Sequence, residues 1–225
     1  EVILPDILSA DENAQITIKL NPALTPIGNA QALYARYNKL QRRLVATAAQ
    51  LEDCRAETDY LHTVAHALET AALPDNINEI KRELISGGYI KEKSKARKTA
   101  SVPTVAPLQT SIDGMSLLIG RNNYQNDRLT FKTAQPNDLW FHVKDIPGSH
   151  VILRTGNTKT SADTIALAAN YAAWYSKARN SANVPVDYTL CRYVKKPSGA
   201  KPGYVIYDKQ QTVYVTPNEE LIDTK

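Results

Sequence analysis

Residues 119–151 read IGRNNYQNDRLTFKTAQPNDLWFHVKDIPGSHV, and the interpretation of the chain starts from this segment. It combines four asparagines, three aspartates, two histidines and one tryptophan with a strand-like alternation of apolar and polar residues. Each buried polar atom needs a hydrogen-bond partner, so an ordinary apolar core does not gather such side chains. We therefore expect a functional site here.

The second half of this segment predicts two strands joined by a turn. Residues 138–144 alternate, and one of the two faces carries Trp140, His142 and Lys144. The turn at 145–148 leads into a returning strand that begins with Ser149 and His150. Paired strands would gather these side chains on one face, where an exposed Trp beside Lys and imidazole suits base stacking and phosphate contact. In the alternative, Trp140 belongs to the core and the histidines bond to backbone groups, and spacing alone does not separate the two.

The segments on either side complete a mixed α/β domain over residues 109–225. Asp113-Gly114 between two apolar runs is typical of a hairpin turn. An asparagine at or near Asn126 caps a short helix, and Ser161 caps an alanine-rich helix that extends to about residue 180. Further strands are predicted around 186–193, 204–207 and 212–215, in a largely antiparallel sheet.

The first 90 residues predict a short strand at 15–20, one long helix and a short helix that begins near Asn76. The long helix begins at Thr25-Pro26 and ends before Pro74. Its apolar residues recur at alternating spacings of three and four from residue 33 to residue 72, the pattern of a coiled coil. Such a helix needs a partner, either another copy of the chain or a helix outside it, and we expect the second.

The predicted fold class is therefore α+β, in which a long coiled-coil helix is followed by a mixed α/β domain. We divide the chain into a coiled-coil arm (1–90), a basic linker (91–108) and the α/β domain (109–225). The chain begins with Glu1 and its one methionine is Met115, so we expect further domains on the N-terminal side.

Charge is distributed unevenly along the chain. Acidic residues outnumber Lys and Arg by 12 to 8 in residues 1–90, whereas Lys and Arg outnumber acidic residues by 19 to 11 in residues 91–225. A basic second half indicates an anionic partner, first of all nucleic acid, although solubility alone can also explain it. The basic loop at 192–201 suits contact with a phosphate backbone, or it is a solvated loop. The segment Gly120-Arg121-Asn122-Asn123 either places the Arg121 guanidinium on a phosphate, which its geometry suits, or is a simple turn.

Several classes of protein are disfavoured. No apolar run approaches the ~20 residues that span a bilayer, and no leader opens the chain, so we expect a cytoplasmic protein that does not bind membranes. Cys54 and Cys191 are read as buried packing positions. His62 and His66 are expected on the surface of the long helix.

Catalytic and metal sites have little support in the sequence. A zinc site of His142, His150 and Asp138 lacks further ligands. A hydrolase that uses Ser149 and a histidine lacks a recognisable nucleophile motif. We expect no cofactor, no metal and no catalytic residue.

Several motifs are shared with a known family. They are Gly120-Arg121-Asn122-Asn123, Gln125-Asn126-Asp127, Leu129-Thr130, Asp138, Trp140-Phe141-His142, Lys144-Asp145, Pro147-Gly148-Ser149-His150-Val151 and the loop 196–203. Together they resemble the signature of the NFACT-R domain, which ends the proteins of the NFACT family, including its RqcH-type bacterial members. The helix opening at 21–31 is similar to the returning helix of that family's middle coiled coil.

This resemblance implies a function in ribosome quality control. Members of the family bind a large ribosomal subunit that holds a stalled peptidyl-tRNA, recruit tRNA and promote a C-terminal alanine tail, while the ribosome forms the peptide bonds. Bacterial members have also been described as fibronectin-binding proteins, which implies an adhesion module as the alternative, with a surface-associated pool. The expected partners are therefore the large ribosomal subunit, ribosomal RNA and tRNA, and in the alternative fibronectin.

The residues expected to contact RNA are polar, basic or aromatic. They are Arg121, Asn122, Asn126, Lys132, Trp140, His142, Lys144, His150, Lys195, Lys196 and Lys201. Those expected to support the site structurally are Asp113, Gly120, Asp127, Asp138, Pro147, Gly148 and Ser149.

Overall fold

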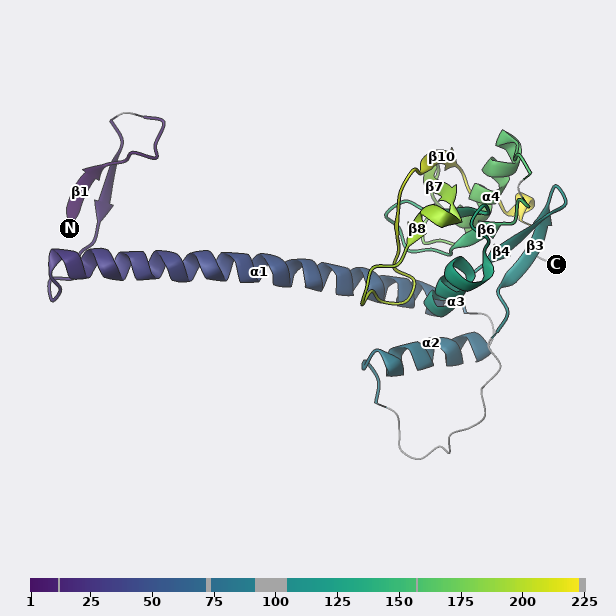
Figure 1. Ribbon diagram of the computed structural model, residues 1–225, viewed down its shortest axis with the longest axis horizontal. Coiled ribbons are helices and arrows are strands. Elements are labelled where there is room, and N and C mark those ends of the chain that lie inside the picture. The colour runs from purple at the N-terminus through teal and green to yellow at the C-terminus, as the bar shows by residue number, and fades with distance from the viewer. Residues whose placement is uncertain (12, 72–73, 92–104, 157, 223–225) are drawn as a thin grey trace. The chain divides into compact units, whose positions relative to one another are not determined.

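The computed structural model describes residues 1–11, 13–71, 74–91, 105–156 and 158–222. The chain consists of two compact units, Glu1–Ala56 and Glu57–Lys225. The longest helix, α1 (Pro26–Glu69), begins in the first unit and ends in the second (Figure 1). The centre of the predicted linker, residues 92–104, lies outside the described residues.

The first unit consists of a hairpin and most of α1. Strands β1 (Val2–Pro5) and β2 (Gln15–Ile18) pair antiparallel, and only the second of them was predicted. The helix start at Thr25-Pro26 is confirmed, because the Gly28 N–H donates to Thr25 Oγ1 at 3.1 Å. The Asn21 N–H donates to Asn29 Oδ1 at 2.7 Å, which fastens the preceding loop to the first turns of the helix.

The apolar seam of α1 is exposed in the first unit. Leu33, Tyr37, Leu40 and Leu44 are all exposed, which is consistent with a helix that has a partner beyond the described residues. Cys54 on the same helix is also exposed, so the expectation that it is buried is wrong, whereas Cys191 is buried as expected. No helix within the described ranges combines the length and apolar character that a membrane span requires.

The second unit includes the last turns of α1, which pack against α2 (Pro74–Ser86). Tyr60, Val64 and Ala67 of α1 form a buried cluster with Ile80 of α2. The sequence suggested one arm over residues 1–90, whereas the compact units divide the chain between Ala56 and Glu57. α2 begins at Pro74, two residues before the start that the sequence favoured.

A six-stranded antiparallel sheet forms the centre of the second unit. Its order is β10-β7-β5-β6-β4-β3. The strands are β3 (Leu108–Ile112), β4 (Met115–Ile119), β5 (Leu139–Val143), β6 (Val151–Leu153), β7 (Val184–Leu190) and β10 (Gln211–Val215). A separate ribbon pairs β8 (Val194–Lys195) with β9 (Ile206–Tyr207). The α+β class and the mostly antiparallel sheet are thus confirmed.

Local signals account for the turns and helix starts. Asp113 and Gly114 have φ of 49° and 75°, the left-handed conformation that a tight β3–β4 hairpin needs. Asn122 caps α3 (Asn123–Arg128) by accepting from the Gln125 N–H, and a π-helical turn (Leu129–Thr133) follows. Ser161 caps α4 (Ala162–Trp174), as predicted.

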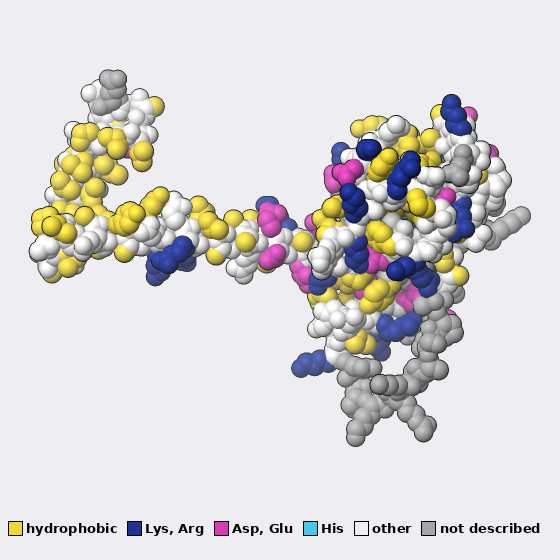
Figure 2. All heavy atoms as spheres, in the orientation of Figure 1, with side chains coloured by type: hydrophobic (Ala, Val, Ile, Leu, Met, Phe, Trp, Pro, Cys, Tyr) yellow, Lys and Arg dark blue, Asp and Glu magenta, His cyan; other side chains and the backbone are white. Residues whose placement is uncertain are grey.

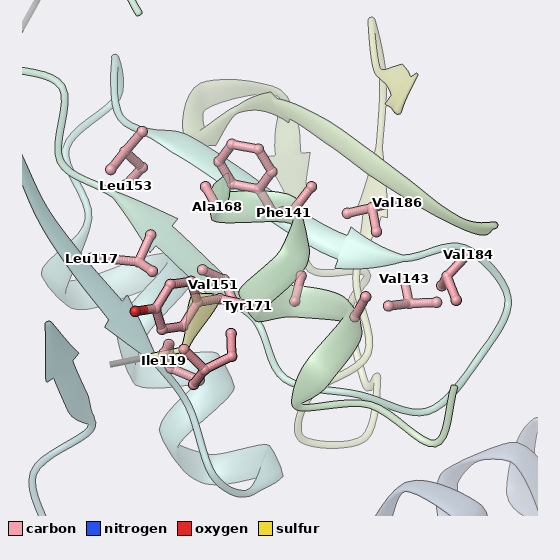
Figure 3. Packing of buried hydrophobic residues seen from close by; sticks show 14 of the residues in the cluster. Leu117, Ile119, Phe141, Val143, Val151, Leu153, Ala168, Tyr171, Val184 and Val186 are labelled. Carbon is pink, nitrogen blue, oxygen red and sulfur yellow. The ribbon is translucent and has the colours of Figure 1, made fainter. Parts of the chain in front are cut away.

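Helix α4 covers one face of the sheet. Its small Ala168, Ala169, Ala172 and Ala173 let it approach the strands closely, and Figure 3 shows Ala168 and Tyr171 among strand residues. The strand side chains of this cluster include Leu117, Ile119, Phe141, Val143, Val151, Leu153, Val184 and Val186.

The opposite face of the sheet is covered as well. Leu118, Trp140 and Ile152 on this face form a second buried cluster, which is completed by residues from the π-helical turn and from the segment that leads into β8. Both faces of β5 are therefore covered by other parts of the chain. This includes the face with Trp140, which the sequence analysis predicted as an RNA-binding surface.

Candidate nucleic-acid interface

The asparagine-rich signature lies between the sheet and α2. Asn122 and Gln125 donate from their side-chain amides to Glu79 Oε2, at 2.8 and 2.7 Å. Asn123 Nδ2 donates to Glu83 Oε1 at 2.9 Å. These bonds satisfy two buried carboxylates that lie one helical turn apart on α2, so the signature attaches α2 to the domain.

Glu83 is also bound from α1. Tyr60 Oη donates to its Oε1 at 2.8 Å, and Asn123 Nδ2 reaches Thr63 Oγ1 at 2.8 Å. Burial raises the pKa of Glu83, while the bonds from Asn123 and Tyr60 oppose that rise. The expectation that Asn122 contacts RNA is not supported, because its side chain is buried in this network.

Asn126 has a structural role too. Its Oδ1 accepts the His150 N–H at 3.0 Å and so joins α3 to the start of β6. A Cβ on Gly120 would lie 2.1 Å from this same oxygen, so only glycine fits there. Asn126 is 4% exposed and cannot reach a solvent-borne partner, which corrects its assignment as an RNA contact.

The rings of Trp140, His142 and His150 lie in contact, with Trp140 and His150 buried and His142 half-buried. The indole stacks on His142 at 5.7 Å between ring centroids and meets His150 edge-on at 5.2 Å. Trp140 is 0% and His150 2% exposed, so the expectation of an exposed stacking surface is wrong. The physical reason is that the segment 191–207 and the π-helical turn cover this face of the sheet.

Burial has a clear electrostatic consequence for these histidines. It lowers the pKa of His142 to about 4 and that of His150 well below its usual value. His150 Nδ1 and Thr130 Oγ1 form a hydrogen bond of 2.8 Å, so this nitrogen is already engaged. No group of three or more His, Cys, Asp or Glu side chains suited to a metal ion occurs in the described part of the chain.

The glycine- and proline-containing loop 196–203 is held against the domain by its own lysines. Lys196 bonds to Asp127, which also accepts the Gly203 N–H at 2.9 Å. Lys201 Nζ donates to Tyr89 Oη at 2.8 Å and lies 3.2 Å from Glu57 Oε2. The Lys196 and Lys201 side chains remain 31% and 40% exposed in these pairs, so their contact with a phosphate backbone stays a prediction.

The other predicted contacts have different environments. Lys132 and Lys144 are exposed, and Arg121 is half-buried. Lys195 is exposed and lies 3.8 Å from Asp208, a weak pair at the surface. For these four residues, contact with RNA stays a prediction.

The residues predicted as supports make bonds that hold the frame together. Asp113 accepts from Thr164 Oγ1 at 2.6 Å, Asp138 accepts the N–H groups of Gln135 and Thr155, and Pro147 O accepts the Lys177 N–H at 2.9 Å. A Cβ on Gly148 would lie 2.8 Å from Ser176 Cβ, and the Ser149 N–H donates to Tyr175 O at 3.0 Å.

The register of the central strands creates an exposed basic surface at one end of the sheet. Leu139 opens β5 and pairs with Leu153 at the end of β6 and with Leu190 at the end of β7. Arg154 and the turn Cys191–Tyr193 therefore emerge at the same end of the sheet, on either side of the start of β5. Asp138 fixes both, since its carbonyl accepts the Cys191 N–H at 2.9 Å and its Oδ1 accepts the Thr155 N–H at 3.3 Å.

We call this surface the cationic rim and define it by its residues. They are Lys132, Arg154, Arg192, Tyr193, Lys195 and Lys209. The Tyr193 ring lies 5.3 Å from the Arg192 guanidinium and 4.6 Å from Lys209 Nζ. Arg154 donates to Thr133 O at 2.8 Å, next to Lys132. Apart from Lys195, none of its cations is in an ion pair among the described residues.

The cationic rim carries the chemical groups that bind a nucleic acid. Guanidinium and ammonium groups suit phosphates, and a tyrosine ring suits a base. Figure 2 shows Lys and Arg side chains scattered over the visible face of the second unit, with acidic and hydrophobic side chains among them. Arg154, Tyr193 and Lys209 were missed in the sequence because they are far apart along the chain, and only the strand register brings them together.

Two family models match the chain. One describes NFACT N-terminal and middle domains and matches residues 1–102, and the other describes an NFACT protein RNA binding domain and matches residues 106–209. The boundary between the two models falls within the predicted linker.

Relatives and a solved structure agree with these models. The chain is 42% identical over 214 residues to the Rqc2 homolog RqcH of Bacillus subtilis and 41% identical over 209 residues to that of Streptococcus suis. It covers 37% of each of these proteins, and they match 94% and 92% of this chain. The C-terminal structure of the fibronectin/fibrinogen-binding protein from Streptococcus suis is 40% identical with a TM-score of 0.76, and the match covers 89% of this chain and 80% of that one.

Proposed function

The chain belongs to the NFACT family, and we propose on this basis that it is the RNA-binding part of a ribosome quality-control factor. The cationic rim is the observation that carries the proposal. It offers five cations and one aromatic ring at one end of the sheet, within the segment that matches the RNA binding domain. Such a surface binds phosphates while a base stacks on the ring.

In this proposal the RNA is that of the large ribosomal subunit or of tRNA bound to it. The chain acts by binding and not by catalysis, and the alanine tailing of a stalled nascent chain belongs to the whole protein. The names of the Bacillus and Streptococcus relatives support this assignment. The chain spans little more than a third of those relatives, so their remaining segments supply the other steps.

Co-sedimentation with purified ribosomal subunits tests the proposal. The chain should pellet with large subunits at low salt, should be released as salt rises, and should pellet far less with small subunits. Equal pelleting with both subunits at every salt concentration would argue for non-specific charge binding. Absence of binding to large subunits at low salt would contradict the proposal.

A second candidate function is adhesion to a matrix protein. The 40% identical Streptococcus suis structure, of which this chain covers 80%, is that of a fibronectin/fibrinogen-binding protein. Immobilised fibronectin should then capture the chain at nanomolar concentration in physiological salt. Capture of this strength by a chain that ignores large-subunit RNA would favour adhesion over the ribosomal function.

A further inference from the structure

A cavity of about 380 Å³ lies between α2 and α3 and is separate from the cationic rim. Its lining consists of Glu79, Arg82, Ser86, Tyr124, Gln125 and Arg128. Figure 1 shows α2 next to α3. The volume is near the lower end of the range for small-ligand pockets, which is the scale of one nucleotide.

Helical spacing forms the two walls. Arg82 and Ser86 are four residues apart on α2, and Tyr124 and Arg128 are four residues apart on α3, so each pair lies on one helix face. The bonds from Asn122 and Gln125 to Glu79 hold the two helices together at the base. The cavity is therefore built by the same network that attaches α2 to the domain.

The lining of the cavity carries two arginines, Arg82 and Arg128, against one carboxylate, Glu79. The Glu79 carboxylate is 4% exposed, and its oxygens accept N–H groups from Val105, Asn122 and Gln125. Arg128 donates one N–H to Val105 O at 2.8 Å, and Arg82 Nε donates to Asn78 O at 3.3 Å.

Both arginines keep donors for an anion. A guanidinium has five N–H groups, and each of these side chains donates one hydrogen bond within the described residues. Neither is in an ion pair there. Tyr124 is 37% exposed and presents an aromatic ring beside them.

We propose that this cavity binds one unpaired nucleotide of an RNA strand, with its phosphate on Arg82 and Arg128 and its base on the Tyr124 ring. This proposal rests on the proposed function and extends it. Tyr124, Gln125 and Arg128 belong to the segment that matches the RNA binding domain, whereas Glu79, Arg82 and Ser86 belong to the segment that matches the N-terminal and middle domains. The site is thus shared between the two segments, and residues 106–209 alone hold only half of it.

Fluorescence anisotropy with a labelled single-stranded 12-nucleotide oligouridylate tests this in the full chain. Arg82→Ala and Tyr124→Ala should each weaken binding about tenfold, and Tyr124→Phe should bind like wild type because it keeps the ring. Lys81→Ala is the matched control, since it removes one exposed positive charge from the same helix without lining the cavity. It should weaken binding less than about twofold. Thermal melting of each variant verifies that it is folded.

The outcomes separate this proposal from the one before it. If wild type binds the oligonucleotide and a folded Arg82→Ala or Tyr124→Ala variant binds equally well, the cavity is not a nucleotide site, while RNA binding by the rim stands. If Lys81→Ala weakens binding as much as Arg82→Ala, the effect is general charge and the proposal fails. If wild type binds no RNA, both proposals fail. Loss of polyglutamate binding in Arg82→Ala with unchanged RNA binding would assign the cavity to an acidic peptide instead.

Discussion

Asn123 joins three elements through one side-chain amide. Its Nδ2 donates to Glu83 of α2 and to Thr63 of α1, while the residue itself opens α3. An amide in this position satisfies a buried carboxylate that would otherwise carry an unmet bond. This single residue therefore contributes to the stability of the junction between the helices and the sheet.

Replacement of Asn123 should destabilise the second unit. Asn123→Ala removes the bond to buried Glu83, and the free energy of unfolding should fall by about 1–3 kcal/mol. Asn78→Ala is the control, because Asn78 is exposed on α2 and a helical alanine costs nothing there. Urea denaturation measures both variants. Equal stability of Asn123→Ala and wild type would show that the network does not hold the helices.

The lowered pKa of His142 predicts how the stability of the folded protein depends on pH. The pKa of His142 is about 4 in the folded protein and lies near 6.5 in the unfolded chain, so the unfolded state binds more protons between these values. The contribution of His142 to the free energy of unfolding is therefore fully present above about pH 6.5 and is lost as the pH falls towards 4. Because His142 is half-buried and partly screened by solvent, the loss from this one group should be about 1–3 kcal/mol.

His142→Asn should flatten that fall, whereas His62→Asn at an exposed site of α1 should not. Unfolding free energies measured between pH 4 and pH 7 give the comparison. His150, whose pKa is lowered in part by His142, also changes in His142→Asn, whereas groups remote from this site contribute equally to all three proteins. Parallel curves for wild type and His142→Asn would mean that the imidazole is not desolvated.

At the scale of single residues, the sequence identified the unusual side chains of the segment 119–151 but not their role in the structure. Period-two alternation placed Trp140 and His142 opposite Phe141, and that register is confirmed. It could not reveal that residues 191–207, about fifty positions later, cover the polar face. Concentrated amides and rings indicated function in the sequence, but in the structure they bond within the protein.

At the scale of elements, the loop 196–203 packs closely against the first residue of α3, Asn123. Gly199 and Gly203 have φ of 76° and 81°, a region that favours glycine. A Cβ on Gly199 would meet nothing within 4 Å, whereas a Cβ on Gly203 would lie 2.6 Å from Asn123 Oδ1. The two positions share the same backbone strain and differ in the available space.

Gly203→Ala should therefore destabilise more than Gly199→Ala. Gly199→Ala should cost about 1 kcal/mol through backbone strain alone. Gly203→Ala should cost about 1–3 kcal/mol more, because the loop or Asn123 has to move. Thermal unfolding of the two variants measures the difference. Indistinguishable melting temperatures would show that the loop is not seated on Asn123.

Elements with strong local signals were predictable, and weakly signalled ones were not. The start of α1, the Asp113-Gly114 hairpin and the Ser161 cap each depend on one or two residues, and each is confirmed. The strand β1 and the π-helical turn have no comparable local signal. The boundary at 56/57 depends on tertiary packing of Tyr60, Val64 and Ala67, which periodicity cannot express.

At the scale of the whole molecule, the charge of the sequence predicted the class of partner better than it predicted the residues that contact this partner. The basic excess of residues 91–225 predicted a polyanion, and the match to an RNA binding domain agrees with that class. Three lysines of the loop were assigned to RNA contact, and two of them, Lys196 and Lys201, pair with acidic side chains of the same chain at partly exposed positions. The rim instead assembles Arg154, Arg192 and Lys209 through strand register, and a linear sequence shows no such grouping.

The salt dependence of RNA binding tests the role of the rim most directly. Binding to the large ribosomal subunit should be measured from 50 to 300 mM salt for wild type, for Arg192→Ala with Lys209→Ala, and for Lys159→Ala with Lys177→Ala as a control of equal charge. The rim pair should lower the slope of log K against log salt by about 1–2, since each lost phosphate contact removes roughly 0.7–0.9. The control pair should keep the wild-type slope. A wild-type slope in the rim pair would contradict the assignment of the rim as the RNA-binding surface.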